Sequence, residues 1–275
     1  MTAFDSARPR SERRVRPPAV AGTFYPGASE AVRAAVREAF ADAVPPVEGA
    51  PVPDALVVPH AGFVYSGSIA ASAYARIAPA RSTIRRVVLL GPSHRTYVRG
   101  LAAPSVDAFR TPLGDVPIDA PARSMALTLP GVELDDRAHA DEHSLEVQLP
   151  FLQTVLDDFT LLPLSVGDAS VDEVAAVLEA CWGGPETLVV ISTDLSHYHR
   201  YDDAARLDAR TAAAVVARRP DAIGDRDACG ARPLRGLLQV ASDHGLAVEQ
   251  LDLRSSGDTA GDHHRVVGYG AFAVS

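Results

Sequence analysis

Three short apolar runs in this chain are each followed within a few residues by a histidine. Such runs are typical of strands buried in a parallel sheet, where helices cover both faces and the alternation of polar residues is lost. Ligands of such sheets bind beyond the carboxyl ends of the strands. The pattern therefore predicts that His60, His94 and His197 converge on one metal or acid–base site. The runs with their histidines are residues 55–60 (ALVVPH), 87–94 (VVLLGPSH) and 188–197 (LVVISTDLSH).

The order of strand-like and helix-like segments predicts an α/β fold. We expect a single-domain sandwich over residues 17–275, with a central, mostly parallel sheet and some antiparallel strands, and a flexible N-terminal tail over residues 1–16. The expected helices are 29–40, 68–77, 142–156, 171–182, 202–218 and 232–243. The expected strands are 56–58, 86–90, 161–166, 188–191, 247–254 and 266–274, with an antiparallel insertion within 100–119.

The composition argues against several classes of partner. The formal net charge is −9 and the isoelectric point is near 5.4, whereas nucleic-acid binding needs a basic face. No apolar run approaches the ~20 residues that span a bilayer, and the basic N-terminus lacks the apolar core of a secretory signal. Two cysteines give no disulfide framework. We therefore expect a cytoplasmic protein that binds neither nucleic acid nor membrane.

His60 and His94 are candidate metal ligands. Each follows its strand through a turn that contains proline, in PHAG at 59–62 and GPSH at 91–94. Imidazole is the commonest protein ligand for iron, zinc and copper. The alternative for each is a loop histidine whose ring hydrogen bonds to a nearby carbonyl.

Asp194 and His197 are a candidate acid–base pair. If a helix begins in this stretch, the two side chains lie on one face and can touch. A carboxylate beside an imidazole raises the pKa of the histidine and fixes one tautomer, as general acid–base catalysis requires. The alternative is that Thr193 or Asp194 only caps the helix.

The segment DEHSLE at 141–146 is the densest polar cluster in the chain. On the expected helix, His143 and Glu146 are i, i+3 neighbours, and Glu142 lies in the first turn, where a carboxylate suits the helix dipole. The alternative is a well-capped helix start with a solvated acidic face. His139, just before the cluster, is expected at the surface.

The two cysteines differ in their surroundings. Cys229 directly precedes the expected helix 232–243, and a thiol at a helix N-terminus has a lowered pKa, so its thiolate is accessible to a metal or an electrophile. Cys181 lies in an apolar helical stretch and is expected in the core. The remaining histidines, His199, His244, His263 and His264, are expected at the surface.

Seven motifs in this order together resemble one family. They are GTFYP (22–26), PHAG (59–62), GPSH (91–94), RTPLG (110–114), DEHSLE (141–146), STDLSH (192–197) and CG (229–230). The chain resembles the Memo family, whose prokaryotic members are called AmmeMemoRadiSam system protein B. The resemblance covers residues 15–274.

The resemblance implies a fold similar to that of class III extradiol dioxygenases and a metal site formed by His60, His94 and Cys229. It also implies that a second set of residues lines the same pocket in catalytic roles. These residues are His197, Asp194, His143 and Glu142. Members of the family are described as binding iron or copper, and eukaryotic ones as binding phosphotyrosine peptides. One departure matters: the dioxygenases use two histidines and a carboxylate, whereas a cysteine thiolate is softer and favours copper(I) or zinc.

Three hypotheses of function follow. The first is an oxidoreductase that uses iron (Fe²⁺), with copper or zinc as alternatives, and in which His197 beside Asp194 moves protons. The second is a metal-binding or chaperone protein without turnover. The third is a peptide-binding module whose crevice accepts an anionic or aromatic side chain, with Arg232 and His94 as anion contacts. A zinc hydrolase has only the ligand types in its favour, and the sequence leaves the small-molecule or peptide substrate and the oligomeric state open.

Overall fold

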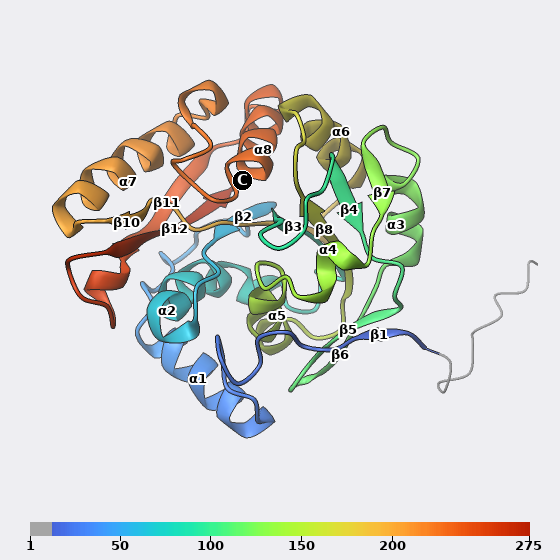
Figure 1. The fold of residues 1–275 in the computed structure, drawn as a ribbon, viewed down its shortest axis with the longest axis horizontal. Helices are drawn as coiled ribbons and strands as arrows, with labels where there is room; N and C mark the ends of the chain where they lie inside the picture. The colour runs from blue at the N-terminus through green and yellow to red at the C-terminus, as the bar shows by residue number, and fades with distance from the viewer. Residues whose placement is uncertain (1–12) are drawn as a thin grey trace, which may run out of the picture.

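Four parallel strands form the centre of the main sheet (Figure 1). The structure is a computed structural model and describes residues 13–275. In order across the sheet, the four strands are β2 (Ala55–Val58), β9 (Thr187–Ser192), β3 (Arg86–Pro92) and β8 (Thr160–Val166). All their residues are buried except the first of β3 and of β8. Burial on both faces explains why their sequences are continuous apolar runs.

Further strands extend the sheet on both sides. β12 (Val266–Val274) lies antiparallel to β2, and both β11 (Val248–Ser255) and β10 (His197–His199) pair antiparallel with β12. On the other side, β4 (Leu101–Ala103) lies antiparallel to β8, and β7 (Val132–Leu134) lies parallel to β4. The predicted α/β fold with a mostly parallel sheet and some antiparallel strands is therefore confirmed.

Helices cover both faces of the sheet, and successive residues of β2 alternate between two apolar clusters. Leu56 and Val58 pack with α1 (Ser29–Ala41), α2 (Phe63–Tyr74) and α5 (Leu149–Val155). The opposite face packs against α3 (Ala120–Ala126), α6 (Val171–Cys181), α7 (Tyr201–Val216) and α8 (Ala231–Asp243). The remaining short elements are α4 (Arg137–Ala140) and 3₁₀ segments at Ala75–Ala80, Glu146–Gln148, Pro220–Ala222 and Ser256–Asp258.

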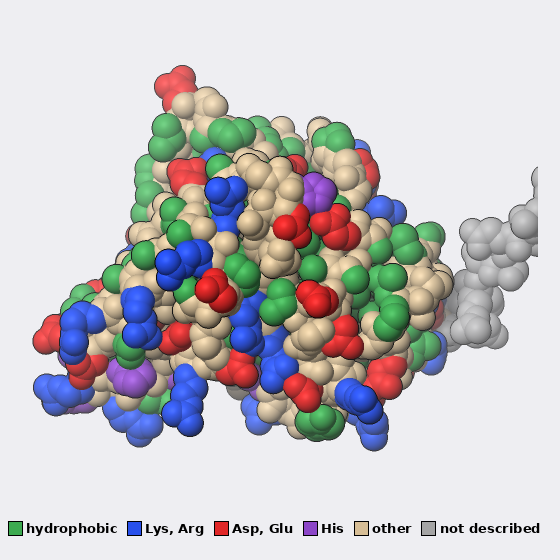
Figure 2. Space-filling view, turned by 90° about the horizontal axis from the view of Figure 1, so that it is seen from above, with side chains coloured by type: hydrophobic (Ala, Val, Ile, Leu, Met, Phe, Trp, Pro, Cys, Tyr) green, Lys and Arg blue, Asp and Glu red, His purple; other side chains and the backbone are tan. Residues whose placement is uncertain are grey.

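Most predicted elements are confirmed. The six predicted strands and the helices predicted at 29–40, 171–182, 202–218 and 232–243 are present, with ends within two residues. The helix predicted at 68–77 begins instead at Phe63, directly after Gly62. Figure 2 shows basic and acidic side chains intermixed over the face that it presents. In the described part of the chain, no helix combines the length and apolar character needed to cross a membrane.

Near the site, one predicted helix is wrong, and a second helix that was considered there does not form. Residues 142–156 do not form one helix, because α5 begins only at Leu149, with Pro150 in its first turn, where a missing N–H costs nothing. The chain after β9 does not open a helix either. Leu195 donates its N–H to the carbonyl of Gly268, and Gly268 donates to Ser196, so this stretch follows β12 into the edge strand β10.

A second, three-stranded sheet includes the beginning of the described chain. β1 (Val15–Arg16) lies parallel to β5 (Ala108–Thr111), which forms a hairpin with β6 (Gly114–Pro117). The antiparallel insertion predicted within 100–119 is therefore present only in its second half, since β4 joins the main sheet. Residues 1–12 of the predicted tail lie outside the described residues. The prediction that the tail extends to residue 16 is wrong, because Val15 and Arg16 form a strand.

Arg16 anchors this strand to the loop that carries the acidic cluster. Its guanidinium forms a buried ion pair with Glu146 and donates hydrogen bonds to the carbonyls of His139 and Glu142. The Glu146 carboxylate also accepts the phenol of Tyr25 and two backbone N–H groups. A buried carboxylate left without its cation carries an uncompensated charge.

We expect Arg16→Met to lower the free energy of unfolding by about 3–5 kcal/mol, because it leaves Glu146 buried and unpaired. Arg81→Met is the matched control, since the Arg81–Asp157 pair is exposed and an exposed pair contributes ~0–1 kcal/mol. Denaturant unfolding of both variants measures the difference. Equal losses in the two variants would contradict the anchoring role of Arg16.

Candidate metal centre

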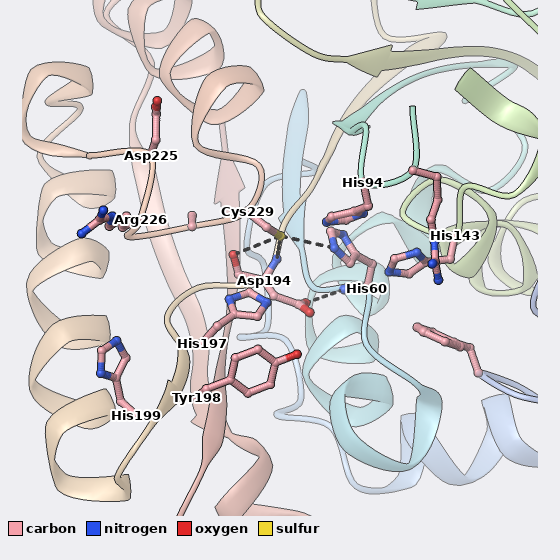
Figure 3. A pocket seen from close by; sticks show the side chains of 13 residues that line it. His60, His94, His143, Asp194, His197, Tyr198, His199, Asp225, Arg226 and Cys229 are labelled. Carbon is pink, nitrogen blue, oxygen red and sulfur yellow. Dashed lines mark hydrogen bonds between the residues drawn. The ribbon is translucent and has the colours of Figure 1, made fainter. Parts of the chain in front are cut away.

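Three side chains meet at the carboxyl ends of the central strands (Figure 3). His60 follows β2, His94 follows β3, and Cys229 lies just before α8. The Nε2 atom of His60 lies 3.3 Å from the Sγ atom of Cys229, and one donor atom from each of the three residues lies within 4.8 Å of the other two. We call these three residues the His/Cys cluster. His197, the third strand-end histidine, is not part of it.

Contacts with the loop after β9 position Cys229. Its N–H donates to the carbonyl of Asp194 at 3.2 Å, and the Asp194 N–H donates to Sγ at 3.3 Å. The N–H of Gly230 donates to the Thr193 hydroxyl at 2.8 Å. A Cβ at Gly230 would lie 2.7 Å from the Cβ of Thr193, so only glycine allows this close approach.

The hydrogen bonds of Ser192 fix the tautomer of His60. The Ser192 hydroxyl donates its only proton to the carbonyl of Ser144 at 2.6 Å, and it accepts from Nε2 of Gln148 at 2.8 Å. The Nδ1 atom of His60, 2.9 Å from the same oxygen, must therefore carry a proton. The lone pair of His60 is left on Nε2, which faces the cluster. Tyr74 donates to Oε1 of Gln148 at 2.9 Å and thereby orients the amide.

Glu142 fixes the second ring in the same way. Its carboxylate lies 2.9 Å from Nδ1 of His94 and accepts the backbone N–H groups of His94, His143 and Ser144. Burial by itself would raise the pKa of Glu142, but the hydrogen bonds lower it to about 2. The ionised carboxylate keeps the proton of His94 on Nδ1 and its lone pair on Nε2, an arrangement common around metal sites. This geometry favours a positioning role for Glu142 over proton transfer.

His143 forms part of the cavity wall. Its ring stacks on that of His94 with centroids 4.8 Å apart and contacts the ring of Phe24 at 4.7 Å. Burial and repulsion by His60 lower the pKa of His143 to about 4, so the ring is neutral at pH 7. Its Nδ1 atom has no hydrogen-bond partner among the described residues. The predicted helical neighbour, Glu146, instead pairs with Arg16.

Asp194 and His197 do not form the direct pair that was predicted. The Asp194 carboxylate accepts the backbone N–H of His60 at 2.8 Å, and burial raises its pKa. His197 lies in β10 and uses Nδ1 to donate to the carbonyl of Leu195 at 2.8 Å. Its Nε2 atom is left with a lone pair. The prediction fails because the two residues lie in a loop and an edge strand rather than on one helix.

The pKa predicted for Cys229 is also wrong. Burial, together with the neighbouring carboxylate of Asp194, raises the pKa of the thiol to about 12. Gly230 is the N-cap of α8, but the half-buried side chain of Cys229 points toward His60 and the backbone of Asp194 in the cavity wall. Desolvation of the thiolate outweighs the helix dipole here.

The remaining predictions concern the exposure of the other histidines and of Cys181, and the availability of Arg232. His139 is only 2% exposed, contrary to expectation, because its Nε2 bonds to the carbonyl of Ala102. Cys181 lies in the core as predicted, and His199, His244, His263 and His264 are exposed as predicted. Arg232 is not free for an anion, since it pairs with Asp168 and Asp225.

A cavity with two lobes surrounds the cluster. Lobe 1, about 720 Å³, contains the His/Cys cluster and has Arg95 and Arg226 in its wall. Lobe 2, about 580 Å³, lies toward α2 and β12. The two share the wall residues Phe24, His143, Asp194, His197 and Tyr198. The sequence analysis assigned no role to Phe24 or Tyr198, nor to Ser192 and Gln148. The only sequence sign of Gln148 is a polar residue within an apolar stretch, VQL.

The fold and the cluster define an α/β protein with a candidate metal-binding centre at the ends of its parallel strands. Comparison with protein families gives a match to the Memo-like protein family over residues 16–273. The chain belongs to this family.

Two relatives illustrate the match. The chain is similar to a MEMO1 family protein of Methanopyrus kandleri, with 35% identity over 93% of this chain and 97% of that protein. It is 34% identical to a MEMO1 family protein of Aeropyrum pernix over 95% of this chain and 100% of the relative. Among solved structures, an uncharacterized protein of Escherichia coli K12 matches with a TM-score of 0.53. At 15% identity, covering 80% of this chain and 98% of that one, this likeness concerns the fold alone.

We expect Ser192→Ala to free His60 to exchange between tautomers and to weaken zinc binding about tenfold or more, because the acceptor for Nδ1–H is lost. Nitrogen-15 NMR of the histidine rings reports the tautomer in metal-free protein, and competition with a chelator reports the affinity. Ser165→Ala is the control, since this buried strand serine has a hydroxyl without a partner. An unchanged tautomer in Ser192→Ala would contradict the assignment.

We expect zinc binding at pH 7 to release about one proton from Cys229, because its pKa of about 12 keeps the thiol protonated, whereas a metal binds the thiolate. His60 adds none, since burial lowers its pKa to about 3 and the ring is already neutral. The apparent affinity therefore rises as pH rises, by about tenfold per unit from this group. Calorimetry in buffers of different ionisation enthalpy counts the protons, and Cys229→Ser should lack this release.

Proposed function

We propose that this protein binds iron as Fe²⁺ through His60, His94 and Cys229 and carries out redox chemistry on a small organic molecule in the cytoplasm. The observation that carries the proposal is the grouping of donor atoms from two imidazoles and one thiol within 4.8 Å of one another, with each ring held by a hydrogen bond at Nδ1. A reducing compartment keeps such a cysteine available to a metal.

The donor atoms fit a metal ion. Metal–nitrogen and metal–sulfur bonds of ordinary length place the two donors about 3.6 Å apart in a tetrahedral site. The 3.3 Å between Nε2 of His60 and Sγ of Cys229 is close to this value. Three protein ligands leave at least one position open for another molecule. Iron is the metal proposed because the family resembles the non-haem iron dioxygenases in fold.

Bound iron would supply a redox-active Lewis acid with an open position. The protein's own groups would do the rest. Glu142 and Ser192 hold the two rings, and His197, in the wall that both lobes share, would take a proton from a bound molecule through the Nε2 atom that its contact with Leu195 leaves free. The carboxylate of Asp194 accepts the backbone N–H of His60 and so holds the turn at that residue.

A second candidate is a copper-holding protein without turnover. Cys229 stands where the dioxygenases have a carboxylate, and a soft thiolate favours copper(I). The same preparation distinguishes the two, because a copper-holding protein would bind copper(I) stoichiometrically and show no substrate turnover.

We expect protein purified without a metal-affinity tag to contain iron, up to about one ion per chain. Cys229→Ser and His60→Ala should lose it, because each removes a donor atom from the cluster. Cys181→Ser should retain it, since Cys181 lies in the core away from the cluster. Elemental analysis measures all four proteins. Iron retained by Cys229→Ser would contradict the ligand assignment.

Oxygen uptake tests the redox step. Metal-free protein is reconstituted anaerobically with Fe²⁺ and then exposed to oxygen with a series of catechols and thiols. Uptake above that of free iron, and its loss in His197→Gln with iron still bound, are the expected results. Iron binding without uptake for any compound would leave a metal-binding protein and remove the oxidoreductase.

A further inference from the structure

Lobe 2 of the cavity has the composition of a binding site for an organic molecule. Its volume of about 580 Å³ is in the range of small-molecule sites. Aromatic side chains form much of its wall, and one of them, Tyr269, is only 1% exposed. Side chains of this kind bind a planar apolar body by stacking and by burial of its surface. The aromatic wall residues are Phe24, Tyr65, Tyr198 and Tyr269.

Among the described residues that line this lobe, Arg265 is the only arginine or lysine. Its guanidinium lies over the ring of Tyr198, 4.9 Å from the centroid, which holds it in place by a cation–π interaction. Within residues 13–275 no carboxylate lies within ion-pair distance of this guanidinium. Its donors are therefore available to a planar anion, which an arginine fork binds in two places at once.

The backbone around Tyr198 supports a binding role. Tyr198 has φ of +64°, a left-handed conformation that costs a residue with a side chain free energy. The conformation interrupts the pairing of β10 with β12 between His197 and His199. It places the Tyr198 ring, 63% exposed, at the boundary of the two lobes, beneath Arg265.

We propose that lobe 2 binds a small aromatic monocarboxylate, with the carboxylate on Arg265 and the ring against the exposed rings of Tyr65 and Tyr198. A single negative charge suits the lobe better than two, because its wall holds one arginine together with the carboxylates of Asp262 and Asp194, and these repel a dianion more strongly than a monoanion. The Asp262 carboxylate also accepts the N–H groups of His264 and Arg265, so it is fixed in place and repels a dianion such as a phosphate monoester.

As a substrate lobe, this site rests on the function proposed above. A ring bound with its carboxylate on Arg265 lies toward the wall that both lobes share, and the His/Cys cluster lies behind that wall. His197 lies in that shared wall beside Tyr198. Binding itself needs no metal, so it can be measured on metal-free protein.

The test compares benzoate, benzamide and phenyl phosphate on metal-free protein by saturation-transfer NMR and calorimetry. Benzoate should bind about tenfold or more tightly than benzamide, which has the same ring without the charge. It should also bind more tightly than phenyl phosphate. Arg265→Gln should lose about tenfold in benzoate affinity, whereas Arg226→Gln, which changes an arginine of lobe 1, should stay within about twofold.

Equal affinity for benzoate and benzamide in the unaltered protein would overturn the proposal, and this comparison needs no variant to fold. Tighter binding of phenyl phosphate, or an equal loss in Arg226→Gln, would overturn it as well. The result is independent of the metal proposal. Benzoate binding by a protein that never takes up iron removes the proposed redox function alone, and iron uptake without benzoate binding removes the proposed lobe alone.

Discussion

The backbone pairing of β2 with β9 is the constraint on which the candidate centre depends. Val58 lies opposite Ser192, and the N–H of Thr193 donates to the carbonyl of Val58 at 2.8 Å. This register sets the turn at His60 beside Asp194. Because both strands are buried on both faces, a slip of one residue would exchange every side chain between the two apolar clusters. The packing of the core thus also fixes where the donor atoms lie.

A buried polar layer lies directly beneath the centre. Ser144, Gln148 and Ser192 are completely buried, yet each makes hydrogen bonds. Unpaired polar groups at this depth would be costly, whereas a fully bonded network holds one geometry. The charge states nearby matter as well. Burial lowers the pKa of His60 and keeps its ring neutral, while the contacts of Glu142 with His94 and with backbone N–H groups keep that carboxylate ionised. The His/Cys cluster therefore offers an imidazole lone pair to a cation.

The sequence predicted the sheet well because each central strand is recognisable from its own residues. An unbroken apolar run such as 187–192 is typical of a strand that helices cover on both faces. The motif order pointed to the family and to the residues of the cluster. The helix wrongly predicted over residues 142–156 has an identifiable cause. Gln148 bonds to Ser192, 44 residues away, and Arg16 reaches Glu146 across 130 residues. The spacing of apolar residues in 142–156 does not reveal either long-range contact. The sequence therefore predicts an amphipathic helix where the chain forms a buried loop held by these contacts.

The raised pKa of Cys229 also affects the reactivity of the chain before it binds a metal. A protonated thiol is a poor nucleophile, and oxidation by peroxide begins from the thiolate. The raised pKa of Cys229, about 12 because of burial and the carboxylate of Asp194, therefore keeps the free thiol protonated and slows its oxidation. In a newly synthesised chain, the protonated thiol of Cys229 therefore reacts slowly with oxidants until a metal binds. The same sulfur becomes an electron-rich donor only when a metal ion displaces its proton.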